Sequence, residues 1–455
     1  MVDWLLDAHR VAPLQFEMGG GWAPISVRDQ MVRGQELVRR AIEAQLIGSA
    51  RPLIVVGAGA GGLAAAVTAA DQRIPIPVIV IERASRAFDR QVGVTARKLH
   101  PYVYDWPLDR FAEVRFAPPP APAVLAWKEA DADDCAVQWQ AALAAHRSRP
   151  IVWYGATIAP SSSSALSIVQ VGRFLRVLVQ RTPVRRIWLR AGMLLSSVGF
   201  GAELTTVGSS NQAYVYEGER FWQNDRLADP NLAASKIVIA GGGDGGLQDA
   251  MRALLVPTFH DVRALLAKLP PIPDDLRVMI ADADDTAQRA WLWSPDRAND
   301  CPILSTLHQR VKIAVDAYWA ANSTPITDAL EHCWRANVNV TLAHPCTHFG
   351  RGYVLNRFLV LLLARAAPDG RLTIEPNRLL DAADHLGGGA CAIAPCPSRH
   401  RATFLHATCR STPTVPSSSR DADLLIIRGG VGPPTSPLAT SPVANRRQHL
   451  PDRPR

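Results

Sequence analysis

The chain has 455 residues and a formal charge of +8 at pH 7, with 48% hydrophobic and 20% charged residues. This balance excludes an intrinsically disordered chain and a multi-span membrane protein, and the length allows two or three domains of about 100–200 residues. Only five of the 49 basic residues are lysines, in a chain with 35 prolines. We attribute the excess arginine to GC-rich coding bias and predict no nucleic-acid partner.

Seven cysteines, an odd number, occur without a CxxC pair, and the N-terminus MVDWLLDAHR lacks a basic segment followed by an apolar core. Reduced thiols in a cytoplasmic protein are the simplest interpretation. Residues 52–70 carry no charge over 19 positions, about the length of a membrane span. Their pattern of strand and glycines argues against a span, so we predict no membrane partner.

The first predicted element is a helix in residues 1–50, an N-terminal helical extension. Ser26 and Asp29 form a capping box, and an apolar face runs from Val27 to Leu46 before Gly48 ends the helix. A buried strand at 52–56 follows, then a glycine turn, a helix at about 60–72 and a second strand at 76–82.

Further along, we predict a strand at residues 151–154. The serines at 161–164 are predicted to precede a helix that reaches about Arg181. Two more buried strands, at 193–198 and 236–240, each end in glycines. Helical patterns dominate from about 247 to 367. Beyond residue 385, clusters of glycine, proline and serine indicate an irregular tail, within which we predict one last strand at 423–428. We expect residues 431–455 to be disordered.

The first glycine turn fits the pattern GxGxxG, and it lies between a strand and a helix as dinucleotide binding requires. Gly57 permits the tight turn, Gly59 allows close approach of a pyrophosphate, and Gly62 allows the helix to pack on the strand. Glu82 ends the next strand 20 residues after Gly62, where its carboxylate can accept hydrogen bonds from ribose hydroxyls.

These residues resemble the two-dinucleotide-binding flavoproteins, which bind FAD in an N-terminal Rossmann unit. The matching segments are GAGAGGLAAA at 57–66, which includes Gly61, and VIVIER at 78–83. An acid followed by arginine, here Glu82 and Arg83, is commoner in the FAD-binding members. The resemblance implies FAD with Glu82 on the adenosine ribose.

A second GxGxxG turn follows the strand at 236–240, in the segment KIVIAGGGDGGL, with Gly241, Gly243, Asp244 and Gly246. It is similar to the GGGD turn that opens the NAD(P)H unit of the same flavoproteins. The segment LLSSVGFGAE at 194–203 resembles their A-T-G element, with only its strand and glycine matching. NAD(P)H is therefore a candidate electron donor.

The chain departs from that family after Gly246, because no apolar strand ending in a charged residue follows near position 266. The alternatives for the second turn are that it only closes the sheet, or that Asp244 faces flavin or substrate. The absence of CxxC argues against the thioredoxin-reductase-like branch. No F-x-G-x-x-x-H-x-x-x-W motif of the Baeyer–Villiger monooxygenases precedes the second turn.

The densest polar and aromatic cluster is RKLHPYVYDWP at 97–107. We predict catalytic roles here for His100 as acid or base, and for Tyr104 and Asp105. Arg97 or Lys98 can bind phosphate. The alternative is a rigid turn bounded by prolines that packs against the sheet. His344, Cys346 and His348 alternate in an extended segment, but their spacing is no zinc signature, and we predict no metal site.

We therefore predict an α/β protein with a Rossmann-type FAD/NAD(P)-binding fold and a helical C-terminal portion. Its predicted parts are the extension at 1–50, an FAD-binding domain at 51–234, a second glycine-loop unit with a helical region at 235–384, and the tail at 385–455. The predicted function is an FAD-dependent oxidoreductase acting on a small-molecule substrate. The alternatives are a non-catalytic FAD/NAD-binding sensor or scaffold, and an NAD-dependent dehydrogenase without flavin.

Overall fold

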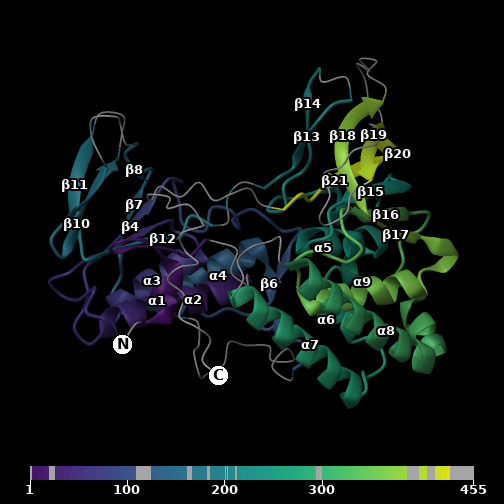
Figure 1. Ribbon diagram of the computed structural model, residues 1–455, viewed down its shortest axis with the longest axis horizontal. Coiled ribbons are helices and arrows are strands. Elements are labelled where there is room, and N and C mark those ends of the chain that lie inside the picture. The colour runs from purple at the N-terminus through teal and green to yellow at the C-terminus, as the bar shows by residue number, and fades with distance from the viewer. Residues whose placement is uncertain are drawn as a thin grey trace.

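A computed structural model of the chain describes residues 3–19, 26–108, 124–160, 167–181, 185–199, 201, 203–210, 213–293, 300–386, 399–406 and 416–430. Figure 1 shows two lobes side by side, each built on a sheet with helices packed below it and an antiparallel sheet rising above it. The predicted tail at 431–455 lies outside the described residues.

The first lobe is organised by a sheet with the order β1-β2-β12-β3-β4-β7, parallel except for β1. Four of its strands were predicted from sequence: β3 (Leu53–Val56), β4 (Val78–Glu82), β7 (Ile151–Tyr154) and β12 (Met193–Ser196). Helix α3 (Ala60–Ala70) connects β3 to β4, and α4 (Ala132–Ala145) precedes β7. This βαβ arrangement confirms the predicted α/β class.

The N-terminal segment contributes strands as well as helices. It contains α1 (Trp4–His9), β1 (Arg10–Ala12), β2 (Gln15–Glu17) and α2 (Val27–Glu43). The predicted capping box is present, with Ser26 and Asp29 bonded to each other's backbone at the start of α2. Because β2 pairs in parallel with β12, the segment completes the first sheet instead of lying outside it.

Helices α2 and α3 cross at close range because glycines lie at the crossing. A methyl group on Gly34 would meet the Gly61 carbonyl oxygen at 2.6 Å, and one on Gly61 would meet the Gln30 carbonyl oxygen at 3.1 Å. The first turn of α3, which carries the glycine motif, is thereby held against α2.

An antiparallel meander covers the other face of this sheet. Its strands are β8 (Thr157–Ile158), β9 (Ile168–Val171), β10 (Phe174–Gln180) and β11 (Arg186–Ala191). The helix predicted to reach Arg181 is therefore wrong. Alternate residues of β10, such as Leu175 and Val177, are buried against Ile54 and Leu194 of the sheet, so the true apolar period here is two and not 3.6.

The second lobe repeats the parallel arrangement in a sheet with the order β17-β16-β15-β21. Its strands are β15 (Lys236–Ala240), β16 (Asn339–His344), β17 (Leu372–Pro376) and β21 (Leu424–Ile427). Helix α5 (Asp244–Leu254) follows β15, and α9 (Val354–Ala366) connects β16 to β17. Between α5 and β16 lie α6 (Val262–Leu266), α7 (Asp274–Trp293) and α8 (Asp300–Leu330), the predicted helical portion.

A second antiparallel sheet packs over this lobe, with the order β14-β13-β18-β19-β20. Its strands are β13 (Thr206–Gly208), β14 (Val215–Glu217), β18 (Arg378–Leu386), β19 (Arg399–His406) and β20 (Pro416–Ala422). The prediction of an irregular tail from 385 is wrong for β19 and β20. The strands are hard to recognise because charged residues such as Arg399 and Arg401 alternate with few apolar ones.

No helix in the described part of the chain is long and apolar enough to span a bilayer. The uncharged window at 52–70 consists of β3, the glycine turn and α3, as its composition indicates.

The α2–α3 crossing predicts whether the substitution Gly34→Ala stabilises or destabilises the protein. Gly→Ala inside a helix ordinarily stabilises by about 1 kcal/mol, but Gly34→Ala places a methyl group 2.6 Å from the Gly61 carbonyl oxygen. We expect Gly34→Ala to destabilise the protein by about 1–3 kcal/mol, measured by urea unfolding. Gly48→Ala is the control, because no atom of the described part of the chain lies within 4 Å of its added methyl group. A more stable Gly34→Ala variant would contradict the close packing.

Candidate functional site

The first glycine turn has the geometry that a dinucleotide pyrophosphate requires. Gly57 has a φ of +105°, and a methyl group on Gly62 would meet the Gly57 carbonyl oxygen at 2.1 Å, so both positions demand glycine. Gly59 is the N-cap of α3, and no side chain caps the helix there. Among the residues that the structure describes, none has an atom within 4 Å of a methyl group built on Gly59, so these residues leave the amides at the helix start accessible.

Glu82 lies beside this turn at the end of β4. Its carboxylate accepts hydrogen bonds from the backbone N–H groups of Ala58 at 2.6 Å and Ala84 at 2.7 Å. The side chain is half-buried, and the next residue, Arg83, is exposed. The predicted contact of Glu82 with a ribose stays a prediction, but the structure brings the carboxylate to the glycine turn as that contact requires.

The element that resembles A-T-G closes the other side of the turn. The Ser197 N–H donates to the Val56 carbonyl oxygen at 2.7 Å. A methyl group on Gly57 would meet the Ser197 carbonyl oxygen at 2.5 Å, and one on Gly62 would meet the Ser197 side chain at 3.2 Å. Residues 193–198 thus pack directly on the first turn.

A cleft opens beside the ends of β4 and β7. Its volume is about 360 Å³, and it is lined by Ser85, Arg86, Ala87, Gln140, Leu143, Ala144, Arg149 and Tyr154. Tyr154 is 41% exposed, and partial burial, with the nearby Glu82 carboxylate, raises the pKa of its hydroxyl. The cleft therefore adjoins Glu82 and presents one aromatic ring and two guanidinium groups.

The second glycine turn has the same local geometry as the first. Gly241 has a φ of +140°, a methyl group on Gly246 would meet the Gly241 carbonyl oxygen at 1.9 Å, and Gly243 is an N-cap of α5 without a side-chain cap. The two turns differ in what lies in front of them.

Residues 349–353 cover the second turn. The Gly350 N–H donates to the Gly242 carbonyl oxygen at 2.8 Å, and the Arg351 carbonyl oxygen lies 3.5 Å from a methyl group built on Gly243. Asp244 accepts hydrogen bonds from the Tyr353 N–H at 3.0 Å and from Asn356 Nδ2 at 2.7 Å. Burial raises the pKa of Asp244. The predicted site residues of this turn therefore contact the protein's own backbone.

The strand that is missing near 266 exists as β16, displaced by the helices α6 to α8 inserted before it. It ends in His344, whose Cβ lies 2.8 Å from a methyl group built on Gly242. Burial lowers the pKa of His344 to about 4, so the imidazole is neutral at pH 7. The strand end carries neither an acid nor a permanent cation.

The predicted catalytic segment 97–107 forms β5 (Lys98–Leu99) and a short 3₁₀ turn, η1 (Val103–Asp105), at the contact between the lobes. Trp106 is buried in the core of the second lobe, with its ring centroid 4.9 Å from that of Phe358. His100 Nδ1 accepts from the Tyr102 N–H at 2.9 Å, and Nε2 lies 3.0 Å from Arg263 Nη1 and 4.0 Å from Glu129 Oε2.

Tyr104 and Asp105 make specific contacts across the same interface. The Tyr104 ring stacks on Tyr353 with centroids 3.9 Å apart, and its hydroxyl accepts from Gln248 Nε2 at 2.5 Å. Burial raises the pKa of Tyr104, so it holds its proton at neutral pH. The Asp105 carboxylate forms a two-point ion pair with Arg28, both contacts at 2.6 Å. The structure thus brings all three predicted residues to one interface.

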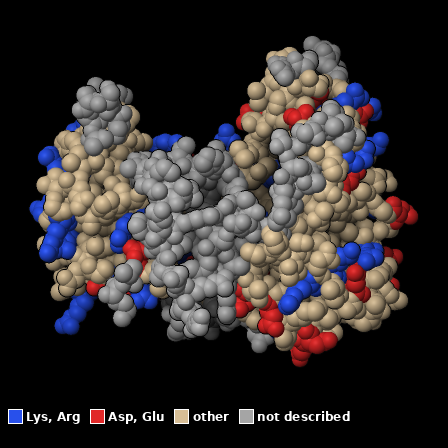
Figure 2. Space-filling model, in the orientation of Figure 1, with Lys and Arg blue, Asp and Glu red and all other residues tan. Residues whose placement is uncertain are grey.

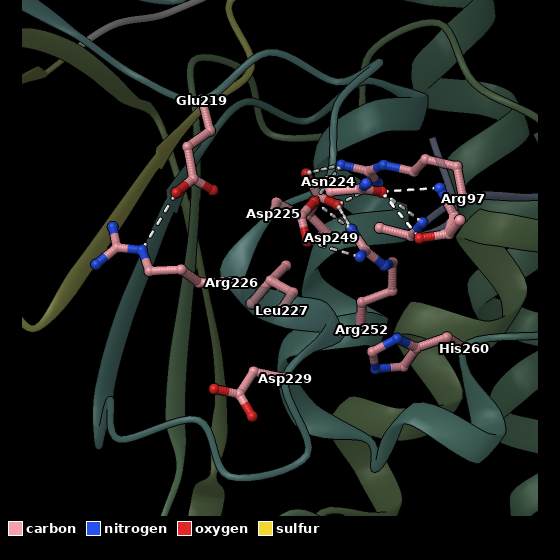
Figure 3. A network of polar contacts seen from close by, with 12 residues as sticks. Arg97, Glu219, Asn224, Asp225, Arg226, Leu227, Asp229, Asp249, Arg252 and His260 are labelled. Carbon is pink, nitrogen blue, oxygen red and sulfur yellow. Dashed lines mark hydrogen bonds and ion pairs between the residues drawn. The ribbon is translucent and has the colours of Figure 1, made fainter. Parts of the chain in front are cut away.

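A buried ionic cluster ties the lobes together beside this segment, and we name it the Asp249 cluster (Figure 3). Its members have side chains no more than 7% exposed: Arg97, Asp225, Asp249, Arg252 and Arg428. Arg97 Nη1 lies 2.5 Å from Asp249 Oδ1, and Arg428 Nε lies 2.8 Å from Oδ2. Asp225 pairs with Arg252 at 2.7 Å and with Arg97 at 2.9 Å.

The charges in the Asp249 cluster depend on one another. Burial alone would raise the pKa of Asp249, but the three neighbouring guanidinium groups lower it well below its usual value. Arg97 also lies 4.0 Å over the ring centroid of Phe221. The predicted phosphate-binding role of Arg97 is therefore wrong, because its guanidinium is paired with protein carboxylates and 3% exposed.

Within the described residues no group of three or more His, Cys, Asp or Glu side chains is placed to bind a metal ion. Cys346 is half-buried, and the Phe349 ring contacts those of His308 and His344 at centroid distances of 5.0 and 5.2 Å.

No protein-family model and no curated protein matches the chain. Solved structures similar to it include an ornithine N-hydroxylase from Kutzneria sp. 744 (14% identity, TM-score 0.36, covering 84% of this chain and 80% of that one). Thioredoxin reductase from T. acidophilum has 12% identity and a TM-score of 0.38, over 84% of this chain and 77% of the other. Bacillithiol disulfide reductase from Staphylococcus aureus has 11% identity and a TM-score of 0.37, over 88% and 79%.

The chain itself has an α/β fold with two parallel Rossmann-type sheets, each of which is followed by a matching glycine turn.

Several residues at the contact between the lobes were missed from the sequence. Asp225, Asp249, Arg252 and Arg428 were not singled out, although Asp249 and Arg252 lie three residues apart among the apolar positions of α5. Arg428 directly follows the buried strand β21. A charge that interrupts a buried run is the available signal, since such a charge needs a partner.

The Asp249 cluster predicts that the substitution Asp249→Asn lowers the unfolding free energy strongly. Asp249→Asn leaves three buried guanidinium groups with a single carboxylate, that of Asp225, and we expect a loss of about 3–5 kcal/mol in unfolding free energy. Urea unfolding at pH 7 measures it. Because the pKa of Asp249 is lowered in the folded state, this advantage of the wild type is full above about pH 4 and shrinks at lower pH. Asp421→Asn, which breaks an exposed pair with Arg401, is the control, with no measurable loss expected.

Proposed function

We propose that the chain binds FAD at the first glycine turn and acts as a flavin-dependent oxidoreductase on a small-molecule substrate. The observation that carries this proposal is the open, uncapped start of α3 at Gly59, next to the Glu82 carboxylate. Anionic phosphates bind at such helix starts through backbone N–H groups and the helix dipole. The carboxylate at the strand end selects a ribose with free hydroxyls over a 2′-phosphate.

The residues present fit FAD. The N–H groups of the turn 57–62 would hold the pyrophosphate, and the Glu82 carboxylate, which now accepts from Ala58 and Ala84, would accept from the ribose hydroxyls. The cleft lined by Tyr154, Arg86 and Arg149 would receive the adenine. Bound FAD supplies hydride and electron transfer, which no side chain of the protein provides.

The second turn serves the interface between the lobes and does not bind a nucleotide. Its front is occupied by Gly350 and Arg351, and Asp244 is held by Tyr353 and Asn356. A pyrophosphate at Gly243 would have to displace this segment and its hydrogen bonds. The electron donor is therefore the substrate itself.

Among the predicted catalytic residues, we retain a proton-transfer role for His100 alone. Its Nδ1 accepts from the Tyr102 N–H, and its Nε2 lies 3.0 Å from the Arg263 guanidinium and 4.0 Å from the Glu129 carboxylate. Burial and the neighbouring Asp261 raise the pKa of Glu129 to about 7. Tyr104 and Asp105 serve to hold the lobes together through Tyr353 and Arg28.

A non-catalytic FAD-binding sensor or scaffold is the second candidate. It is favoured by the way the segment 97–107 is fixed, through Arg97 to Asp249 and through Asp105 to Arg28. Such contacts suit a protein that holds a cofactor in one arrangement of its lobes.

Three glycine substitutions separate binding from folding. Gly59→Ala has room in the folded chain and an extended φ of −78°, yet its methyl group lies where the pyrophosphate must approach. We expect a normal fold and FAD affinity reduced about 10–100-fold, measured by fluorescence quenching of FAD titrated with apoprotein. Gly62→Ala should instead destabilise the fold, because its methyl group meets a carbonyl oxygen at 2.1 Å.

Gly243→Ala is the matched control at the second turn, where the added methyl group makes an ordinary 3.5 Å contact. It should leave FAD affinity unchanged. No FAD uptake by the wild type, or equal loss in Gly59→Ala and Gly243→Ala, would contradict the proposed site.

The closed second turn predicts the behaviour of the pyridine nucleotides. Under anaerobic conditions, addition of NADH or NADPH should not bleach the flavin absorbance of the FAD-loaded protein, because Gly350 and Arg351 cover Gly243. Stopped-flow absorbance spectroscopy measures this, with dithionite as the control for full reduction. Rapid bleaching that Gly243→Ala abolishes would show that the second turn opens and binds the donor.

A further inference from the structure

The segment that forms the meander of the first lobe lacks acidic residues. From Cys135 to Ala202 the chain has eight arginines and neither Asp, Glu nor Lys, whereas the composition of the whole chain predicts about six acids in these 68 residues. A coding bias toward arginine does not explain the missing acids. The arginines are Arg147, Arg149, Arg173, Arg176, Arg181, Arg185, Arg186 and Arg190.

Strand pairing gathers several of these arginines on the outer face of the meander. Arg176 of β10 is directly opposite Arg190 of β11 and Val169 of β9, and Leu178 is opposite Trp188. The alternate residues, Leu175 and Val177 among them, point into the core of the lobe. We name this outer face the meander face: Val169, Val171, Phe174, Arg176, Leu178, Arg186, Trp188 and Arg190.

The meander face carries unbalanced positive charge. Within the described residues no ion pair joins Arg173, Arg176, Arg186 or Arg190 to a carboxylate, in contrast to the paired arginines of the Asp249 cluster. Figure 2 shows Lys and Arg atoms along the outer edge of the lobe that carries β10 and β11. A polyanionic partner is the one that complements this charge.

The same face is also apolar. Val171 is 53% exposed, Trp188 41% and Val169 36%. Branched aliphatic and tryptophan side chains beside arginines are the combination that enters the boundary of a bilayer, where the apolar parts enter the acyl region and the guanidinium groups bind phosphates.

We propose that the meander face docks the protein on a membrane surface rich in anionic phospholipids. This departs from the sequence-based expectation of no membrane partner, and it is independent of the function proposed for the first glycine turn. The contact is peripheral: the lipid phosphates pair with Arg176, Arg186 and Arg190, while Val171 and Trp188 enter the bilayer boundary.

Contacts within the face favour lipid over nucleic acid. Arg190 lies over the Phe174 ring, 3.3 Å from its centroid, and Arg176 lies 5.0 Å from that of Trp188. The ring faces on which unpaired bases would stack are thus covered by guanidinium groups. Val169 and Val171 have no aromatic ring on which a base could stack. A second copy of the chain is disfavoured, since two such faces would repel each other.

Sedimentation of the full chain with lipid vesicles tests the proposal. Vesicles of phosphatidylcholine are compared with vesicles containing about 30% phosphatidylglycerol, and we expect binding only to the anionic ones, lost at about 0.5 M NaCl. The double variant R176A/R190A should bind about 30-fold more weakly. R310A/K312A removes the same charge from exposed positions of α8 and should bind as the wild type does.

Circular dichroism melting checks that both double variants fold, and Trp188→Ala should weaken binding without changing the net charge. Equal loss in the two double variants would show attraction by net charge alone and overturn the proposal. So would absence of binding to anionic vesicles, or tighter binding to a single-stranded oligonucleotide measured by fluorescence anisotropy.

Discussion

The Asp249 carboxylate, with no exposed surface, is a buried ionic junction between the two lobes. It pairs with Arg97 of the first lobe and with Arg252 and Arg428 of the second, while Asp225 balances the arrangement from the connecting segment. Buried charges are tolerated only when paired, so each group fixes the position of the others. The placement of the segment 97–107, and of His100, Tyr104 and Asp105 within it, follows from this constraint.

The two glycine turns show that a motif and a site are different things. Gly57 and Gly241 both have positive φ. Gly62 packs on the Gly57 carbonyl oxygen, and Gly246 packs on that of Gly241. The two turns therefore have the same backbone conformation. The two turns differ in access: no described residue lies in front of Gly59, whereas Gly350 and Arg351 lie against the second turn. The long helical insertion places β16 and this covering segment far from the turn in sequence, so no local pattern reveals the cover.

Much of the fold follows from local sequence. The buried strands at 53–56, 78–82 and 236–240, the capping box at Ser26 and both glycine turns were predicted because short apolar runs, caps and glycines act locally. The meander and the strands β18 to β20 were not, because half of their residues face outward and charges such as Arg176 and Arg401 mask the period of two. The Asp249 cluster was missed because its partners come from positions as far apart as Arg97 and Arg428.

The central claim is that the first glycine turn of this chain binds FAD, and the most direct measurement is the stoichiometry of flavin in the purified or reconstituted protein. The absorbance of FAD released on denaturation, divided by the protein concentration, should give about one FAD per chain, since of the two glycine turns the one at Gly59 is left uncovered by the described residues. A colourless protein that takes up no FAD would contradict the account, and two nucleotides per chain would show that the covered turn at Gly243 also binds.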